Sequence, residues 1–144
     1  MESQPPRDLG PEATVGALLR FAHRKARRVG NTALASIDMD TRRMGVLGVL
    51  FQHGPVTQRE LCDELDVDSS TMVVIVDQLL AEALIDRDRN PADRRSYLIS
   101  LTESGRERVI ACWQLATGVM EELMGHFTQD EREQLARLLI KFVG

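Results

Sequence analysis

Four arginines lie within nine residues of one another, in a stretch whose other ionisable groups are all aspartates. The arginines are Arg87, Arg89, Arg94 and Arg95, and the aspartates are Asp86, Asp88 and Asp93. Guanidinium groups can bind phosphate oxygens, often through two hydrogen bonds at once. The alternative is a solvated hairpin in which the aspartates offset the arginines. Because the cluster alone favours the solvated hairpin, the choice depends on the elements around it.

Three hydroxyl side chains, Ser69, Ser70 and Thr71, follow Asp68 at the start of a predicted helix. Hydroxyls and the free N–H groups of a helix N-terminus can hold phosphates or base edges. Further along the same helix, Gln78 carries an amide of the kind that pairs with adenine in the major groove. These residue types suit contact with DNA, provided that the helix presents them to solvent.

That helix is the second of two short helices joined by a turn. Thr57 and Glu60 have the spacing of a capping box, which starts a first helix that buries Leu61 and Leu65 and ends near Asp66. The second helix is expected at residues 69–82. Its inward face is predicted to be Met72, Ile75, Val76, Leu79 and Leu80, and its outward face Ser70, Val73, Val74, Asp77 and Gln78. The pattern predicts a helix-turn-helix.

Two strands are expected after it, at residues 84–88 and 96–101. Asn90 and Pro91 between them indicate a hairpin tip. Tyr97, Ile99 and Leu101 alternate onto one face of the second strand. The arginine cluster therefore belongs to a hairpin wing beside the helix-turn-helix.

Long amphipathic helices flank this module. They are expected at residues 14–37, at 41–52 and in the last third, where a second capping box at 128–131 starts a final helix. We predict a mainly α fold with a small β-hairpin wing. The predicted parts are a flexible N-terminal tail (1–13), a winged helix-turn-helix DNA-binding domain (39–102) and a helical dimerisation region (14–38 and 103–144).

The flanking helices carry more apolar surface than the small module can cover. In the last third the apolar side chains recur with a period of 3.5 residues, which suits packing against another helix. A partner chain is expected to cover them. The candidate interface residues are Leu18, Leu19, Ala22, Met120, Leu123, Phe127, Leu135, Leu138, Leu139 and Phe142.

Composition limits the possible functions. The 144 residues are 43% hydrophobic and 28% charged, with a net charge of −4, so only the local arginine clusters favour a polyanionic partner. No apolar run is long enough to span a membrane. Cys62 and Cys112 lie far apart, which implies no disulfide framework and a reducing cytoplasm. Scattered histidines and the absence of catalytic motifs predict no metal site, no cofactor and no enzyme.

The motifs together resemble the MarR family of winged helix-turn-helix regulators. The wing motif is Asp93-Arg-Arg95 followed by Leu101-Thr102 and Glu103-Ser-Gly105, and the helix-turn-helix resemblance lies in residues 58–65 and 70–79. In order and spacing the similarity covers residues 18–142. It implies a homodimer that binds a pseudo-palindromic operator in double-stranded DNA. It also implies repression that is relieved by a small molecule or by thiol oxidation.

The resemblance assigns roles to the wing. Arg95 matches the family arginine that enters the minor groove, with Asp93 holding it through a salt bridge; a narrow minor groove attracts arginine by its negative potential. Arg87, Arg89 and Arg94 are expected at phosphates or sugars. Gln58 and Arg59 are expected to touch the DNA backbone at the start of the supporting helix.

Two residues of the outward face depart from the family pattern. Val73 and Val74 are apolar, and the family often has arginine or another polar residue at the position of Val74. Either they contact thymine methyl groups, or this surface packs on something, or residues 72–76 form a strand. Since polar base contacts are few, specificity is expected to depend on the wing and on DNA shape.

Family members bind effectors between the dimerisation helices and the winged domain. By their order in the chain, His23, Met44, Phe51 and Trp113 are candidates for such a pocket, although core packing is the simpler interpretation of each. The basic face at residues 20–28 is either solvated, paired with the partner chain or at the border of an anionic effector pocket.

Two other functions remain open. Cys62 is expected to pack as a small buried hydrophobe and Cys112 to be more exposed, which leaves a redox-responsive regulator as one alternative. The second alternative is a helical dimer that binds proteins and has lost specific DNA binding. Val73, Val74 and the acidic total favour that alternative, and the wing motif opposes it.

Overall fold

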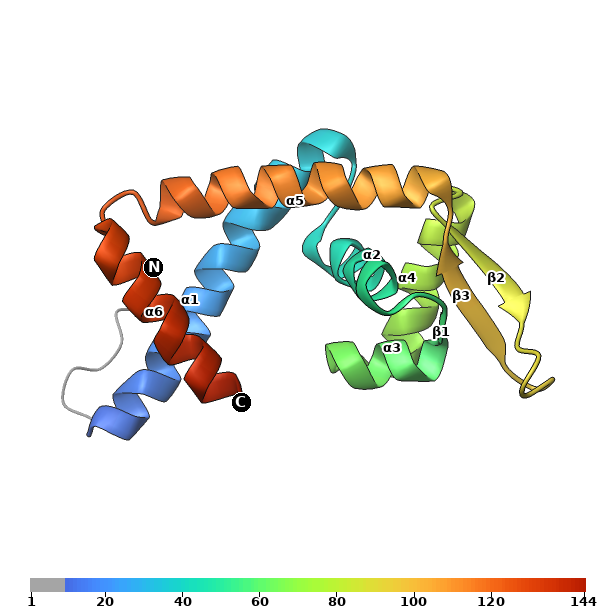
Figure 1. Cartoon of the computed structure of the whole chain (residues 1–144), viewed down its shortest axis with the longest axis horizontal. Coiled ribbons are helices and arrows are strands. Elements are labelled where there is room, and N and C mark those ends of the chain that lie inside the picture. The colour runs from blue at the N-terminus through green and yellow to red at the C-terminus, as the bar shows by residue number, and fades with distance from the viewer. Residues whose placement is uncertain (1–9) are drawn as a thin grey trace.

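The computed structural model describes residues 10–144 as a mainly helical chain with one small sheet (Figure 1). Its elements in order are α1 (Pro11–Leu34), η1 (Ala35–Ile37), α2 (Thr41–His53), β1 (Val56–Thr57), α3 (Gln58–Leu65), α4 (Ser69–Ala81), β2 (Ile85–Arg89), β3 (Tyr97–Leu101), α5 (Glu103–Leu123) and α6 (Gln129–Val143). The predicted class, mainly α with a β-hairpin wing, is confirmed.

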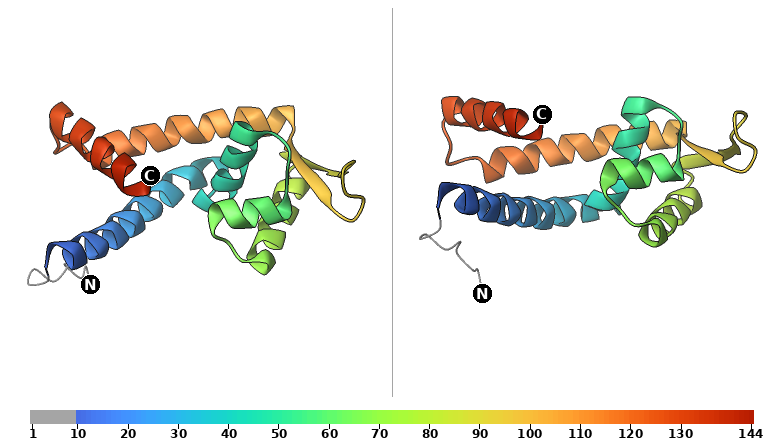
Figure 2. Two further views of the ribbon diagram at one scale, coloured as in Figure 1. Left: turned by 60° about the horizontal axis from the view of Figure 1, so that its bottom comes forward. Right: turned by 90° about the horizontal axis from the view of Figure 1, so that it is seen from below.

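Helix α5 joins the two ends of the molecule (Figure 1). At one end it meets α2 and β3, and it also packs against α1. Helix α6 follows α5 at the end farthest from the wing, where the chain turns back on itself (Figure 2). The chain therefore has a small module, which holds α2 to β3, and an arm made of α1, α5 and α6.

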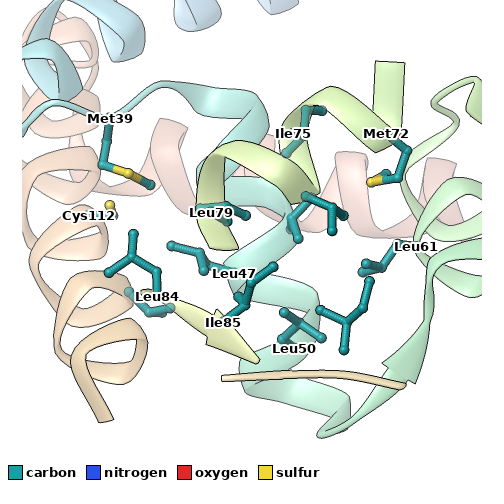
Figure 3. Close-up of a cluster of buried hydrophobic side chains, with 14 of the residues drawn as sticks. Met39, Leu47, Leu50, Leu61, Met72, Ile75, Leu79, Leu84, Ile85 and Cys112 are labelled. Carbon is teal, nitrogen blue, oxygen red and sulfur yellow. The ribbon is translucent and has the colours of Figure 1, made fainter. Parts of the chain in front are cut away.

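The hydrophobic core lies in the module (Figure 3). Helix α4 buries Met72, Ile75, Val76 and Leu79 as the helical period predicted, while Leu80 is only partly buried. The arm contributes Leu34 from α1 and Val109 and Cys112 from α5. Because α1 and α5 both reach into this core, the arm and the module are packed together rather than linked by a free tether.

The sheet contains one strand more than the sequence predicted. Its order is β1-β3-β2, all antiparallel, with Val56 opposite Ile99 and Arg89 opposite Tyr97. Strand β1 has only two residues. A segment of this length is too short to show the alternation of apolar and polar residues that predicts a strand. It attaches the start of α3 to the wing.

Helix α1 differs at both ends from its predicted bounds. It begins at Pro11, in the first helical turn where proline is favoured, so residues 11–13 are helical and not part of a tail. The rest of the predicted tail, residues 1–9, lies outside the described residues. At its far end a 3-10 turn replaces the last α-helical residues, and Asp38 then takes a left-handed conformation with φ of 53°.

The join between the wing and α5 depends on a close approach at Gly105. The Thr102 hydroxyl accepts a hydrogen bond from the Gly105 N–H at 3.0 Å and donates one to the Ala83 carbonyl at 2.8 Å. A Cβ added at Gly105 would lie 2.0 Å from the Leu84 carbonyl oxygen. The close approach of Leu84 therefore explains why the Glu103-Ser-Gly105 part of the wing motif ends in glycine.

Gly105→Ala is expected to lower the free energy of unfolding by about 3 kcal/mol, because the backbone of Leu84 must move to admit the methyl group. Chemical denaturation of the purified variant measures this. Gly118→Ala, on the same helix with nothing within 4 Å of the added Cβ, is the matched control. We expect that control to be neutral or to stabilise by up to about 1 kcal/mol. Equal stability of the two variants would contradict the assigned close approach.

Candidate nucleic-acid interface

Helix α4 starts at a capping aspartate that also holds the neighbouring hydroxyls. Asp68 accepts hydrogen bonds from the Thr71 N–H at 2.9 Å, from the Thr71 hydroxyl at 2.7 Å and from the Ser70 hydroxyl. The bonds from the two hydroxyls and from that N–H hold the pKa of the Asp68 carboxyl well below its usual range. The Ser70 and Thr71 hydroxyls thus donate their protons within the chain. Of these three hydroxyls, that of Ser69 makes no hydrogen bond to a described residue.

The outward face of α4 is open to solvent. Val73 and Val74 are 43% and 56% exposed, and Asp77 and Gln78 are exposed beside them. The alternative of a strand at residues 72–76 is wrong, because this stretch is the middle of a 13-residue helix. Within the described residues nothing packs over the two valines, so the helix presents an apolar stripe between polar side chains.

The wing arginines are organised around Tyr97. The Arg87 guanidinium lies 4.5 Å from the centre of the Tyr97 ring and that of Arg89 lies 5.6 Å from it, within cation–π range. Arg89 also donates a hydrogen bond to the Arg94 carbonyl at 2.9 Å. The aromatic ring and the hairpin backbone therefore restrict two of the four wing cations before any ligand binds.

The predicted Asp93–Arg95 salt bridge is wrong. Asp93 Oδ1 accepts a hydrogen bond from the Arg95 backbone N–H at 3.0 Å, and the ion pairs among the described residues all involve Arg43. The carboxylate makes a local turn instead, as Asp commonly does two residues before its partner. Asp93 therefore shapes the hairpin tip, while the exposed Arg95 side chain is left without a carboxylate partner.

The wing and the start of α3 enclose a hollow of about 420 Å³. It brings together five of the predicted DNA-contacting residues: Gln58, Arg59, Arg87, Asp93 and Arg95. Strand β1 causes this proximity by pairing the start of α3 with β3. Three guanidinium groups against one carboxylate make this surface locally cationic, although the net charge of the chain is −4.

Known proteins are similar to this chain in sequence and in fold. The family model of the MarR family matches residues 37–96. The transcriptional repressor NicR of Pseudomonas putida is 32% identical over 129 residues, which cover 90% of this chain and 82% of NicR. A crystal structure of a mutant Escherichia coli MarR with operator DNA superimposes with a TM-score of 0.79, at 29% identity over 90% of this chain and 94% of that one.

The chain belongs to the MarR family. It is a DNA-binding transcription regulator with a winged helix-turn-helix fold, as its relatives are. BpsR of Bordetella bronchiseptica, whose DNA binding is regulated by 6-hydroxynicotinic acid, has 25% identity and a TM-score of 0.78 over 90% of this chain and 98% of BpsR. The relatives are named as regulators, which agrees with the expectation that the chain is not an enzyme.

A second hollow lies where family members are expected to bind effectors. It measures about 700 Å³ and lies between α1, α2, α4 and α5. His23 and Met44 line it, together with Arg27 and Arg42. Arg27 belongs to the basic face at residues 20–28, and Arg42 was not among the residues predicted from the sequence.

The other two candidate effector residues lie elsewhere. Phe51 and Trp113 pack edge to face, with ring centres 4.8 Å apart. Trp113 lines a different hollow, which also includes Met120 of α5 and Arg132 of α6. Of the four candidates, His23 and Met44 therefore line the hollow between α1, α2, α4 and α5, whereas Trp113 and Phe51, which lies about two helical turns beyond Met44 along α2, do not.

The two cysteines have the opposite exposures from those expected. Cys112 is fully buried and Cys62 only partly buried. Burial raises the pKa of both thiols, and the neighbouring Asp63 and Asp68 raise that of Cys62 further. A raised pKa disfavours the thiolate that a redox sensor needs.

The predicted interface residues lie on the arm, and most are open to solvent in the single chain. Phe142 is 67% and Leu138 is 58% exposed, and no residue of α6 is buried by the described part of the chain. Leu18, Ala22, Met120, Leu135 and Leu139 are also exposed, whereas Leu19, Leu123 and Phe127 are partly buried. Val15, Ile140 and Val143 extend this apolar surface and were not predicted.

No helix within residues 10–144 is long and apolar enough to cross a membrane. No group of three or more His, Cys, Asp or Glu side chains in that range is placed to hold a metal ion.

Proposed function

We propose that the protein is a dimeric repressor that binds a pseudo-palindromic operator and is released by a small organic effector. One observation carries this proposal: the exposed face of α4 and the three-arginine hollow of the wing belong to one module with a shared hydrophobic core. A helix of this kind fits the major groove, and a wing arginine fits the adjacent minor groove. NicR, a repressor by name, supports the repressing role.

The two halves of the DNA contact have different tasks. We assign Gln58, Arg59, Arg87, Arg89 and Arg94, with the Ser69 hydroxyl, to phosphates and sugars. We assign Arg95 to the minor groove and Gln78 to a base edge. Since the Ser70 hydroxyl and both the hydroxyl and the N–H of Thr71 donate to Asp68, we assign the two hydroxyls to DNA contact as hydrogen-bond acceptors.

Selection from a random duplex library with the purified protein tests the proposal. We expect a two-fold symmetric site whose half-site centres lie about one helical turn, roughly 10 bp, apart. Selection of no sequence, with binding that depends on salt alone, would favour the protein-binding alternative. The exposed apolar side chains of Val73 and Val74 support this alternative, because they could contact another protein.

The two valines are expected to read thymine. Replacing thymine by uracil in the selected half-sites removes only the 5-methyl group, and each methyl that Val73 or Val74 covers is worth about 0.8 kcal/mol, or about fourfold in affinity. Fluorescence anisotropy titrations measure the loss. Uracil in the flanking DNA is the control, and Val74→Ser should reduce the sensitivity. Equal affinity with uracil at every half-site thymine would exclude this form of recognition.

The hollow between α1, α2, α4 and α5 is the proposed effector site. Arg27, Arg42 and His23 offer positive or polar contacts, and Met44, Leu34 and Ile75 offer apolar ones. This lining suits a small aromatic acid, the class to which the effector of BpsR belongs. The effector would release DNA only if it binds one arrangement of the module and arm better than the other. The raised thiol pKa values argue against the redox alternative.

A further inference from the structure

Arg43, in the first turn of α2, joins three points of the chain. Its Nε donates to Asp40 Oδ2 at 2.9 Å, and its Nη2 donates to the Asp38 carbonyl at 2.8 Å. Its Nη1 donates to the carboxylate of Glu82, which is 39 residues away in sequence. The Arg43 side chain is 12% exposed, so these contacts hold a largely covered guanidinium group.

The three points lie at the boundary between the arm and the recognition helix. Asp38 ends the turn that follows α1, and Asp40 caps α2. Glu82 is the first residue beyond α4. Both Asp38 and Ala83, next to Glu82, have positive φ values of 53° and 54°. Arg43 thus ties the exit of α1 to the end of the recognition helix at two sharp changes of chain direction.

A second arginine holds the same turn from the other side. Arg108 of α5 donates a hydrogen bond to the Ile37 carbonyl at 2.8 Å. The turn at residues 35–38 is therefore clasped by one guanidinium from the arm and one from the module. Among the described contacts of these two arginines, only those of Arg43 include a hydrogen bond to Glu82, at the end of α4.

This contact is better suited to fixing an angle than to adding stability. Partly exposed ion pairs contribute little to the free energy of folding, and the partner carboxylates of Arg43 are 29% and 40% exposed. A planar guanidinium bound at three points, however, accepts few relative orientations of its partners. Asp40 is on the same helix as Arg43, so Glu82 is the partner that constrains α4.

We propose that Arg43 and Glu82 are positioning residues that set the angle of α4 relative to α1. In a two-fold dimer this angle fixes how far apart, and in which orientation, the two recognition helices meet DNA. The inference rests on the proposed dimeric operator binding. Its signature is a preference for one half-site spacing, which a contribution to stability alone would not produce.

The test compares the parent protein with Arg43→Met, Glu82→Gln and Asp40→Asn. Each is titrated against the duplex selected by the parent and against duplexes with one base pair added or removed at the centre. Arg43→Met and Glu82→Gln are expected to lower the preference for the parental spacing by about tenfold, and the double variant to lower it no further. Asp40→Asn keeps the helix cap and the Glu82 contact, so its preference should match that of the parent.

Unchanged preference in Arg43→Met or Glu82→Gln would overturn the inference. Equal losses in Asp40→Asn and Glu82→Gln would also overturn it, because the effect would then be local to α2. Thermal melting of each variant separates loss of fold from loss of spacing preference. Failure of the proposed function is distinguishable, because the parent itself would then select no spaced, symmetric duplex.

Discussion

Phe142→Asp and Leu138→Asp are expected to convert the proposed dimer into monomers. Both side chains project from one face of α6, which no described part of the chain covers. An isolated helix of this length is marginal in water, so α6 requires packing on another surface. In a two-fold interface each substitution occurs twice, and an unpaired buried charge costs about 3 kcal/mol or more per copy. Dimerisation should therefore weaken about ten-thousand-fold.

Sedimentation equilibrium over a range of concentrations measures this loss. Arg137→Asp is the matched control, because it places the same carboxylate on the opposite side of α6 at an exposed position. We expect this control to remain dimeric. Circular dichroism shows whether the monomers keep the module folded, since its core contains no residue of α6. A Phe142→Asp protein that stays dimeric would refute the placement of the interface.

Arg95→Ala is expected to weaken operator binding by about 1–3 kcal/mol at each half-site while leaving the fold intact. The side chain is exposed, makes no ion pair among the described residues and lines the cationic hollow. The ratio of the affinities for the selected duplex and for a scrambled duplex should also fall in Arg95→Ala. Arg94→Ala removes an equal charge from the same hairpin tip, and it should weaken binding to both duplexes alike. Equal affinity of Arg95→Ala and the parent would contradict the minor-groove assignment.

Asp93 provides a second check on the wing. Because it shapes the turn through the Arg95 N–H, Asp93→Asn should keep this bond and bind DNA at least as well as the parent. Asp93→Ala should weaken binding, because the turn loses its acceptor. These two variants separate the observed backbone contact from a charge contact to Arg95.

The features that the sequence predicted well are those encoded locally. The capping boxes at Thr57 and Thr128 and the cap at Asp68 give the starts of three helices, and the helical period gives the buried face of α4. The hairpin tip at Asn90 separates two strands within a residue or two of their observed ends. Each of these signals depends on neighbouring residues, so no tertiary information is needed.

The features that the sequence missed depend on contacts between distant segments. Strand β1 exists because β3 pairs with it, and the exposures of Cys62 and Cys112 follow from which elements cover them. Phe51 and Met44 lie on one helix but face different surroundings. The contact from Arg43 to Glu82 spans 39 residues, and neither residue is part of a recognisable motif. Such arrangements become visible only once the helices are packed.

Sedimentation of the protein–DNA complex tests most directly whether two copies of this chain bind one symmetric duplex. The parent protein is mixed with the selected duplex, and with a duplex that keeps one half-site, at several salt concentrations. We predict two chains per full duplex, much weaker binding to the half-site, and an affinity that falls steeply as salt rises. One chain bound independently at each half-site, or an affinity insensitive to salt, would contradict the proposed symmetric binding.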